Sequence, residues 1–162
     1  IVRGEAGAPA PAEAVVERDG RELRFRPGTG VRDRRGRGWD VDGDLRAVEA
    51  SISDGVLASA DYPDPLGRLW AALTAPHSGD ILISATQGHE LVDWGGVTHC
   101  PGGSHGSLHA GDSLGPLAFC GLEGVSAADR AQWALGDAAE LVLGHFGLEV
   151  APTAAAMAGG AV

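Results

Sequence analysis

A β-hairpin is predicted near the start of the chain, where apolar and polar residues alternate. In residues 14–28, AVVERDGRELRFRPG, two valines precede a turn, and Leu23 and Phe25 follow it at alternate positions. The turn carries Asp19 and Gly20, a pair that favours the tight turns joining antiparallel strands. We therefore expect two paired strands here.

The next segment, residues 39–57, fits two different patterns. Asp44 suits the N-cap of a short helix that directs Leu45 and Val48 inward. The pair Asp54-Gly55, which lies between apolar residues, suits the turn of a second hairpin instead. The sequence alone leaves both alternatives open.

A helix is predicted within residues 62–76, YPDPLGRLWAALTAP. Asp64 is the predicted N-cap and Pro65 the first helical residue, while Pro76 prevents much extension. The apolar residues that share one helical face are Leu66, Leu69, Trp70 and Leu73.

Two short apolar runs predict buried strands. The first, GDILISA at residues 79–85, is bounded by turn residues and is typical of a strand in a parallel sheet. The second, PLAFCGL at residues 116–122, follows a long glycine-rich loop. A loop between two such strands is where α/β enzymes place their sites.

The last apolar pattern predicts one or two helices within residues 126–150, SAADRAQWALGDAAELVLGHFGLEV. Ser126 and Asp129 have the spacing of a capping box, and an apolar face continues from Leu135 to Gly147, with His145 closing the helix. This helix is expected to pack on the strands. We expect a flexible lead-in at residues 1–12, a single α/β domain at 13–150 and a disordered tail at 151–162.

Charge is distributed unevenly over the 162 residues. Ten arginines and nine acidic residues precede residue 47, whereas two arginines and thirteen acidic residues follow, and the formal net charge is −10. Nucleic acid is therefore not expected as a partner, since its binding depends on basic residues that neutralise phosphates. The arginine-rich run VRDRRGRG, residues 31–38, is interpreted as a solvated loop rather than a phosphate site.

Other features of the composition point to an intracellular protein. Cys100 and Cys120 are too few and too far apart for a disulfide framework, and no apolar run approaches the ~20 residues of a membrane span. We expect a cytoplasmic bacterial protein with no membrane partner. The chain begins with Ile1 rather than methionine, and we interpret it as part of a longer polypeptide.

Three of the six histidines lie within residues 98–121, THCPGGSHGSLHAGDSLGPLAFCG. His105 and His109 are four residues apart, but the surrounding glycines and Pro101 predict a loop, in which this spacing has no fixed geometry. The histidines are then either exposed loop residues or members of a site. Nearby polar residues that suit a supporting shell or the substrate side are Ser104, Ser107, His109 and Asp112.

Residues 102–121, GGSHGSLHAGDSLGPLAFCG, resemble the C-terminal metal-ligand segment of the alkaline phosphatase superfamily. The resemblance is to the type I phosphodiesterase and nucleotide pyrophosphatase branch, with its Gly-x-His-Gly pattern followed by an apolar strand. Residues 133–148, WALGDAAELVLGHFGL, resemble the last helix of the same superfamily. The two segments occur in the expected order and separation.

The resemblance implies a fold and a cofactor. The fold would be α/β, the C-terminal part of an alkaline-phosphatase-like central sheet with flanking helices, here preceded by the β-hairpin. Two zinc ions would bind a phosphate ester, one of them activating a Ser or Thr nucleophile. The metal ligand of the Gly-x-His-Gly pattern falls on His105, whereas Ser104 and Ser107 depart from the residues common there.

Most of the site that the resemblance implies is missing from this sequence. We find no Asp-His-Gly motif and no N-terminal aspartate ligand or nucleophile, so His105 would be one of about six or seven ligands needed. The chain is expected to be inactive alone and to complement an N-terminal half of the same fold. The alternatives are a non-catalytic interaction module and a self-contained metal site of His99, His105, His109 and Asp112.

Overall fold

The computed structural model describes residues 2–3, 12–91 and 106–148. Its first substantial feature is the expected hairpin, formed by β2 (Ala14–Arg18) and β3 (Arg21–Asp33). The two strands pair antiparallel, with Val16 opposite Leu23. Asp19 and Gly20 both have positive φ, as a two-residue hairpin turn requires. The prediction of this hairpin is confirmed.

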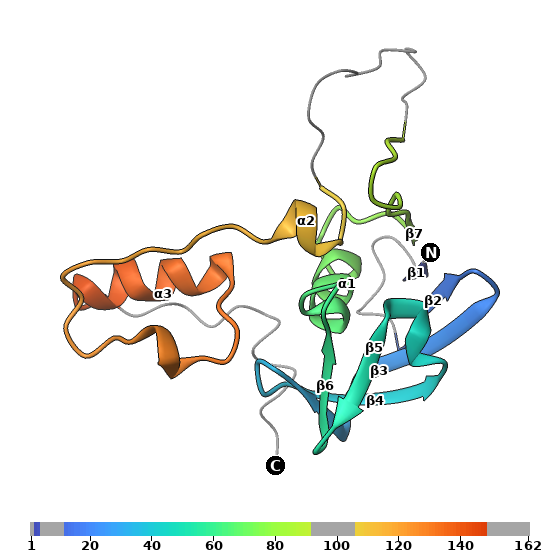
Figure 1. The fold of residues 1–162 in the computed structure, drawn as a ribbon, viewed down its shortest axis with the longest axis horizontal. Helices are drawn as coiled ribbons and strands as arrows, with labels where there is room; N and C mark the ends of the chain where they lie inside the picture. Colours follow the sequence, from blue (N-terminus) through green and yellow to red (C-terminus); the bar gives the residue numbers. More distant parts are fainter. Residues whose placement is uncertain (1, 4–11, 92–105, 149–162) are drawn as a thin grey trace.

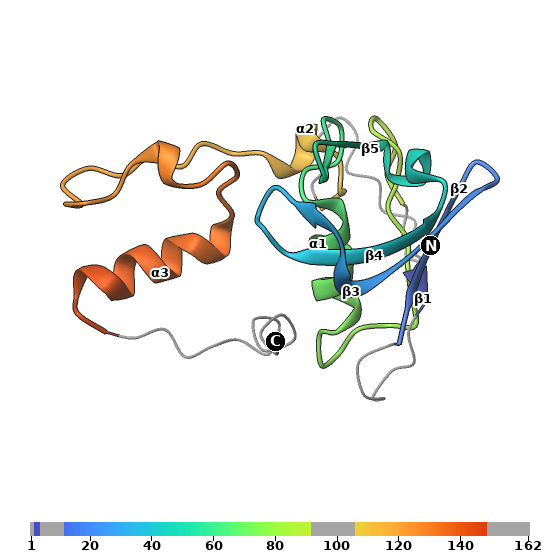
Figure 2. The same cartoon turned by 90° about the horizontal axis from the view of Figure 1, so that it is seen from below.

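Five strands form the main sheet, which is mixed (Figures 1 and 2). The long strand β3 is its centre: it pairs antiparallel with β2 and with β4 (Gly38–Gly43), and parallel with β6 (Val56–Ser59). The pairing of β3 with β4 is interrupted between Pro27 and Val31, where the carboxylate of Asp40 accepts hydrogen bonds from two backbone amides of β3. This irregularity lets one strand of thirteen residues serve several partners.

Both alternatives for residues 39–57 occur in the structure. The 3₁₀ helix η1 (Leu45–Val48) follows Asp44, whose side chain accepts a hydrogen bond from the Arg46 amide. The strand β5 (Ala50–Ser53) then pairs antiparallel with β6, and Asp54 and Gly55 form their turn. The two patterns are compatible because the helix ends before the hairpin begins.

The predicted helix is present as α1 (Pro65–Leu73), and it covers one face of the sheet. Leu66, Leu69 and Leu73 are buried against the strands. The rings of Phe25, Trp39 and Trp70 meet one another in three edge-on contacts, with ring centres 5.7–6.3 Å apart. The buried apolar residues of this core are Ala14, Val16, Leu23, Phe25, Trp39, Ala47, Val48, Ala50, Leu57, Leu66, Leu69 and Leu73.

The position of Gly43 gives a test of the sheet geometry. Its φ is +103°, and a Cβ atom there would collide with the carbonyl oxygen of Glu22 on β3. We expect Gly43→Ala to lower the free energy of unfolding by about 1–3 kcal/mol. The alanine would have its backbone in a sparsely populated region, and its contact with the Glu22 carbonyl oxygen could be relieved only by movement of the backbone. Urea denaturation measures this loss.

The matched control is Gly55→Ala in the β5–β6 turn. Gly55 also has positive φ, at +76°, but a Cβ atom added there would have no neighbour within 4 Å. It should therefore lose less stability than Gly43→Ala. Equal losses in the two variants would show that the contact with Glu22 contributes nothing beyond the backbone conformation.

The two predicted buried strands are wrong. Only Ile81–Leu82 of residues 79–85 form a strand, β7, which pairs antiparallel with β1 (Val2–Arg3), and Ile81 and Ile83 are exposed. Residues 116–122 form no strand, and Leu117 is exposed. Neither apolar run joins the main sheet, because β2 to β6 pair with one another.

The short helix α2 (Ala110–Ser113) lies beside α1, and the described chain after it extends away from the sheet (Figures 1 and 2). This part contains the 3₁₀ helix η2 (Ala127–Asp129) and the helix α3 (Leu135–His145). The capping box of Ser126 and Asp129 is confirmed. The expectation that α3 packs on the strands is wrong, and Leu135, Val142 and Phe146 are largely exposed.

The architecture therefore has mixed α/β character, with a mixed sheet and a few helices. The resemblance to an alkaline-phosphatase-like sheet is not reproduced by the described strands, whose pairing is mainly antiparallel. None of the described helices has the length and apolar character needed to cross a bilayer. Most of the predicted lead-in and the whole predicted tail lie outside the described residues.

Candidate functional site

The candidate site is the segment 106–114, which follows the predicted ligand His105 directly and is held against α1. The guanidinium of Arg68 on α1 reaches into this segment. It donates hydrogen bonds to the Leu108 carbonyl (2.9 Å) and to Ser113 Oγ (2.8 Å), with a longer contact to the Ser107 carbonyl (3.5 Å). One side chain thus fixes three residues of the segment.

Further hydrogen bonds hold the same segment from two other sides. The Leu108 amide donates to Ser84 Oγ (3.2 Å), and the Ala110 amide donates to the Asp61 carbonyl (2.7 Å). Ser113 Oγ donates to the Ser107 carbonyl (3.0 Å), which closes the segment on itself. These hydrogen bonds therefore fix the position of the segment 106–114, which follows His105.

Arg68 has no carboxylate partner among its hydrogen bonds within the described residues. Its donors go to the backbone carbonyls named above, to Ser113 and to the Pro63 carbonyl (3.3 Å). Burial lowers the pKa of the guanidinium. Arginine suits this position because its fork of donors bonds several carbonyls at once.

His109 is the N-cap of α2. Its Nδ1 accepts a hydrogen bond from the Gly111 amide (3.0 Å), and its ring meets the edge of Tyr62, with ring centres 5.6 Å apart. An Nδ1 that accepts this bond is unprotonated, and its lone pair is not free for a metal ion in this conformation. His109 thus has a structural role here.

The other predicted site residues do not assemble into a metal centre within the described part of the chain. Ser107 Oγ accepts from the His109 amide (3.1 Å), and Asp112 lies exposed in the first turn of α2. Across residues 2–3, 12–91 and 106–148, no group of three or more His, Cys, Asp or Glu side chains is arranged to hold a metal ion. His99, Ser104 and His105 lie outside these residues.

The arginine-rich run 31–38 is more than the solvated loop that was expected. It forms the turn between β3 and β4, and its Asp33 is buried, with only 5% of the residue exposed. The Asp33 carboxylate accepts hydrogen bonds from Trp39 Nε1 (2.8 Å) and Arg37 Nε (2.8 Å), and Arg37 also pairs with Asp64. Asp64 therefore binds Arg37 instead of capping α1 with its side chain.

Arg35 of the same turn connects the sheet to α3. Its two Nη atoms donate to the two carboxylate oxygens of Asp137, each at 2.7 Å, and Arg130 Nη1 adds a third bond at 2.9 Å. Asp137 is 1% exposed and also accepts from the Ala134 amide. The bonds from Arg35 are the main reason that the pKa of Asp137 is lowered.

Sequence reasoning missed Arg68 and the Arg35–Asp137 pair. Arg68 had one available signal, because it is the only charged residue in the apolar helix 65–73. Arg35 and Asp137 had none, since they are 102 positions apart and each lies in a segment with other charges. Comparison of the chain with protein-family models, with curated proteins and with solved structures found no match.

Proposed function

We propose that this chain contributes a metal-ligand loop to a zinc-dependent phosphoric ester hydrolase, a phosphodiesterase, nucleotide pyrophosphatase or phosphatase. In this proposal His105 is the ligand, and the chain is the C-terminal part of a fold of the alkaline phosphatase superfamily whose central sheet the described strands do not reproduce. Two zinc ions, a nucleophile and the remaining ligands are supplied by an N-terminal half of the same fold. The substrate is a small phosphate ester, and the protein acts in the cytoplasm without nucleic acid or membrane.

The observation that supports the proposal is the anchoring of residues 107–113 by Arg68. A metal ligand must be held in place, because ordering a flexible loop costs free energy that the metal bond would have to offset. The hydrogen bonds from Arg68 and Ser84 remove much of this freedom on the C-terminal side of His105. They hold the segment that directly follows the Gly-x-His-Gly pattern.

The described donor set does not hold zinc by itself. The candidates Ser107, His109 and Asp112 form no metal-binding group within the described residues, and His109 Nδ1 accepts from a backbone amide. The hydrogen bond to Nδ1 argues against His109 as a ligand, whereas the half-site needs only His105 from this chain and takes its other ligands from elsewhere. Zinc, when bound, would polarise the phosphate ester; the described residues of this chain position the loop.

Zinc titration by calorimetry tests the proposal on two proteins: the 162-residue chain, and the same chain extended upstream in its natural reading frame. We expect weak binding by the former and tight binding by the latter. In the extended protein His105→Ala should weaken zinc binding at least about tenfold and reduce hydrolysis of bis(p-nitrophenyl) phosphate, whereas His109→Ala should have little effect. Tight binding by the 162-residue chain, lost equally in both variants, would refute the half-site.

Arg68→Met tests the supporting observation in the extended protein. It should weaken zinc binding although every proposed ligand is retained. The matched control is Arg46→Met, which removes the same charge from a side chain that is 73% exposed and pairs with Asp44. Equal zinc affinity in the two variants would mean that the anchoring does not order His105.

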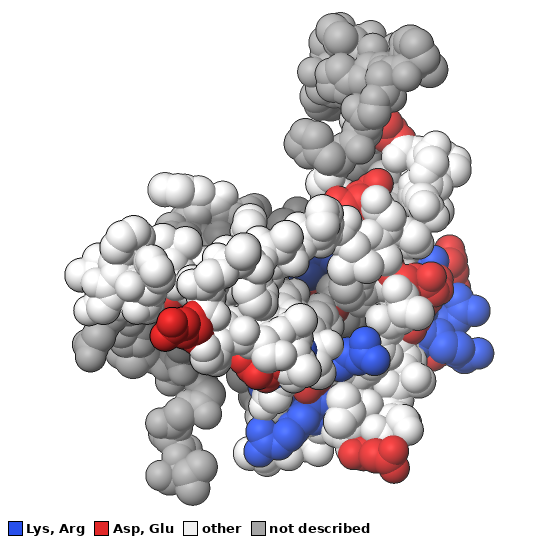
Figure 3. All heavy atoms as spheres, turned by 60° about the vertical axis from the view of Figure 1, so that its left-hand side comes forward, with Lys and Arg blue, Asp and Glu red and all other residues white. Residues whose placement is uncertain are grey.

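A non-catalytic interaction module is the second candidate, and the exposed apolar residues of the α3 region favour it. Leu135 is 90% exposed and Phe146 70%, and uncharged residues make up much of this side of the molecule (Figure 3). Exposed apolar surface of this kind marks a contact with another protein surface. Self-association of the chain that Phe146→Ser abolishes, with no zinc binding by the extended protein, would favour this candidate.

A further inference from the structure

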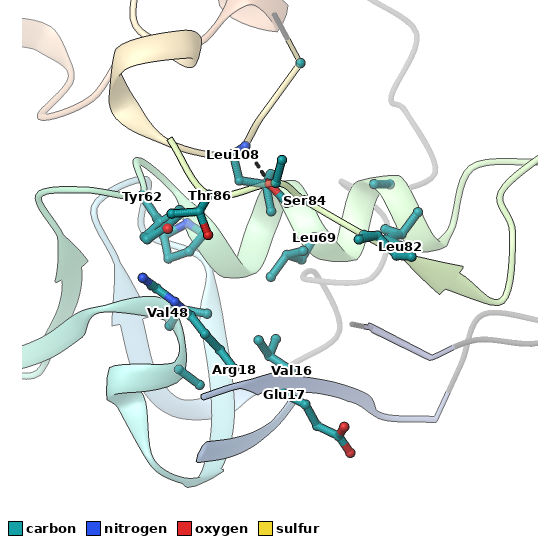
Figure 4. A pocket seen from close by; sticks show the side chains of 16 residues that line it. Val16, Glu17, Arg18, Val48, Tyr62, Leu69, Leu82, Ser84, Thr86 and Leu108 are labelled. Atoms are coloured by element: carbon teal, nitrogen blue, oxygen red, sulfur yellow. Dashed lines mark hydrogen bonds between the residues drawn. The ribbon is translucent and has the colours of Figure 1, made fainter. Parts of the chain in front are cut away.

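A pocket of about 290 Å³ lies between the hairpin, η1, α1 and residues 82–86 (Figure 4). Its walls are mainly apolar, with Val16, Val48, Leu69 and Leu82 on different elements. The volume is close to the lower end of the range of ligand sites, about 300–1,000 Å³. Gly106 and Leu108, which belong to the segment that follows the proposed ligand His105, also form part of its wall.

The polar wall of this pocket is provided by Arg18. Its guanidinium carbon lies 5.2 Å from the centre of the Tyr62 ring, and Nη2 pairs with Glu49 at 2.6 Å. The other terminal nitrogen, Nη1, is shielded from water and has no hydrogen-bond partner within the described part of the chain. A buried donor without a partner is rare in folded proteins and calls for an acceptor.

Two hydroxyl groups extend the donor set along the same pocket. Ser84 Oγ accepts from the Leu108 amide and keeps its own proton for another acceptor. Thr86 lies on the same strand-like segment, and its side chain projects toward the Arg18 side of the pocket (Figure 4). The wall therefore offers hydrogen-bond donors around an apolar centre.

The charges near Arg18 favour a neutral acceptor over an anionic one. Glu49 already neutralises the guanidinium, and Asp19 lies 3.7 Å from Arg18 Nε. A third carboxylate would be repelled by these two groups. A carbonyl oxygen can accept from Nη1 without that cost.

We propose that this pocket binds a small, neutral, mainly apolar molecule that carries a carbonyl oxygen. The apolar body lies against Val16, Leu69 and Leu82, and the carbonyl accepts from Arg18 Nη1. Because Nη1 has almost no accessible surface in this structure, the Tyr62 ring, whose centre lies 5.2 Å from the guanidinium carbon, moves aside to admit the carbonyl. The site shares Leu108 and its hydrogen bond to Ser84 with the support of the proposed zinc loop, but binding there needs no zinc.

Nuclear magnetic resonance titration of the 162-residue chain with three probes tests the site. Acetophenone has an apolar ring and a carbonyl, ethylbenzene lacks the acceptor, and benzoate carries a negative charge. We expect acetophenone to shift the amide signals of Ser84 and Leu108 and the ring signals of Tyr62. Ethylbenzene and benzoate should bind about tenfold more weakly, since each lacks one favourable property.

Three variants make the test specific. Arg18→Met should reduce acetophenone binding to the level of ethylbenzene, and Glu49→Gln, which retains the donor, should improve benzoate binding alone. Ala72→Phe places a ring into the pocket from an exposed position on α1 and should abolish binding of all three probes. This variant also serves if Arg18→Met does not fold.

Several results would overturn the proposal. They are equal binding of acetophenone and ethylbenzene, shifts that persist in Ala72→Phe, and the absence of shifts with any probe. A nuclear Overhauser contact between a pocket methyl group and residues 92–105 in the probe-free protein would also do so, because the chain itself would then fill the pocket.

Discussion

Replacing Phe25 with alanine is expected to reduce the free energy of unfolding by about 3–5 kcal/mol, a large part of the stability of a domain of this size. Phe25 is 1% exposed and lies at the centre of the core. Its ring contacts both Trp39 and Trp70, which also contact each other. The cavity therefore opens between large rings that cannot collapse without losing their own contacts.

Urea denaturation followed by tryptophan fluorescence measures this loss, because two of the four tryptophans line the cavity. Phe146→Ala is the matched control: the same side chain is removed, but from a residue that is 70% exposed. We expect a change within about 0.5 kcal/mol for the control. Similar losses in the two variants would mean that the sheet–α1 core is not the main source of stability.

Asp137→Asn is expected to release α3 from the sheet. The variant keeps the shape of the side chain but removes the charge that accepts two bonds from Arg35 and one from Arg130. The side chain of Arg35 is only 18% exposed, so its charge loses a partner in a place with little water. We expect a cost of about 2–3 kcal/mol to the attachment of α3.

Hydrogen exchange of the α3 amides measures the release, and Glu140→Gln is its control. Glu140 lies on the same helix and pairs with Arg130, but it is 49% exposed. Such exposed pairs contribute about 0–1 kcal/mol. If Glu140→Gln accelerated exchange as much as Asp137→Asn, the buried carboxylate would have no special role.

The same carboxylate makes the attachment sensitive to acid. Its pKa is lowered in the folded protein, chiefly by the hydrogen bonds from Arg35, below the value of about 3.9 for an unfolded aspartate. The stabilisation is therefore complete above about pH 4 and is lost as the pH falls through the folded pKa. Asp64 acts in the opposite sense, because burial raises its pKa. The difference in stability between wild type and Asp137→Asn, measured at each pH, therefore isolates the contribution of Asp137.

Elements with local signals were predictable from the sequence. Asp19-Gly20 supplied a turn with positive φ, and the strands on both sides followed from alternation. Asp54-Gly55 also forms a turn with positive φ, in a hairpin that the sequence offered as one of two alternatives. Pro65 and the apolar spacing after it located α1. In each case neighbouring residues determine the conformation, so a short window of sequence was sufficient.

The candidate site was less predictable, because distant residues create it. Arg68 and Ser113 are 45 positions apart, and their contact follows from how α1 lies beside the 106–114 segment. The run 79–85 looked like a buried strand by composition, yet the strands of the main sheet find their partners elsewhere. His105 remains a prediction from the resemblance, since it lies outside the described residues.

The pairing of Arg35 with Asp137 also has a consequence for the order of folding. The sheet closes through short connections, such as the two-residue turn between β2 and β3, whereas this ion pair joins positions 102 residues apart. Closing a loop of that length costs several kcal/mol of chain entropy, roughly (3/2)RT ln n plus a constant. We therefore expect residues 14–73 to fold first, and α3 to dock onto the finished β3–β4 turn late and to separate from it first.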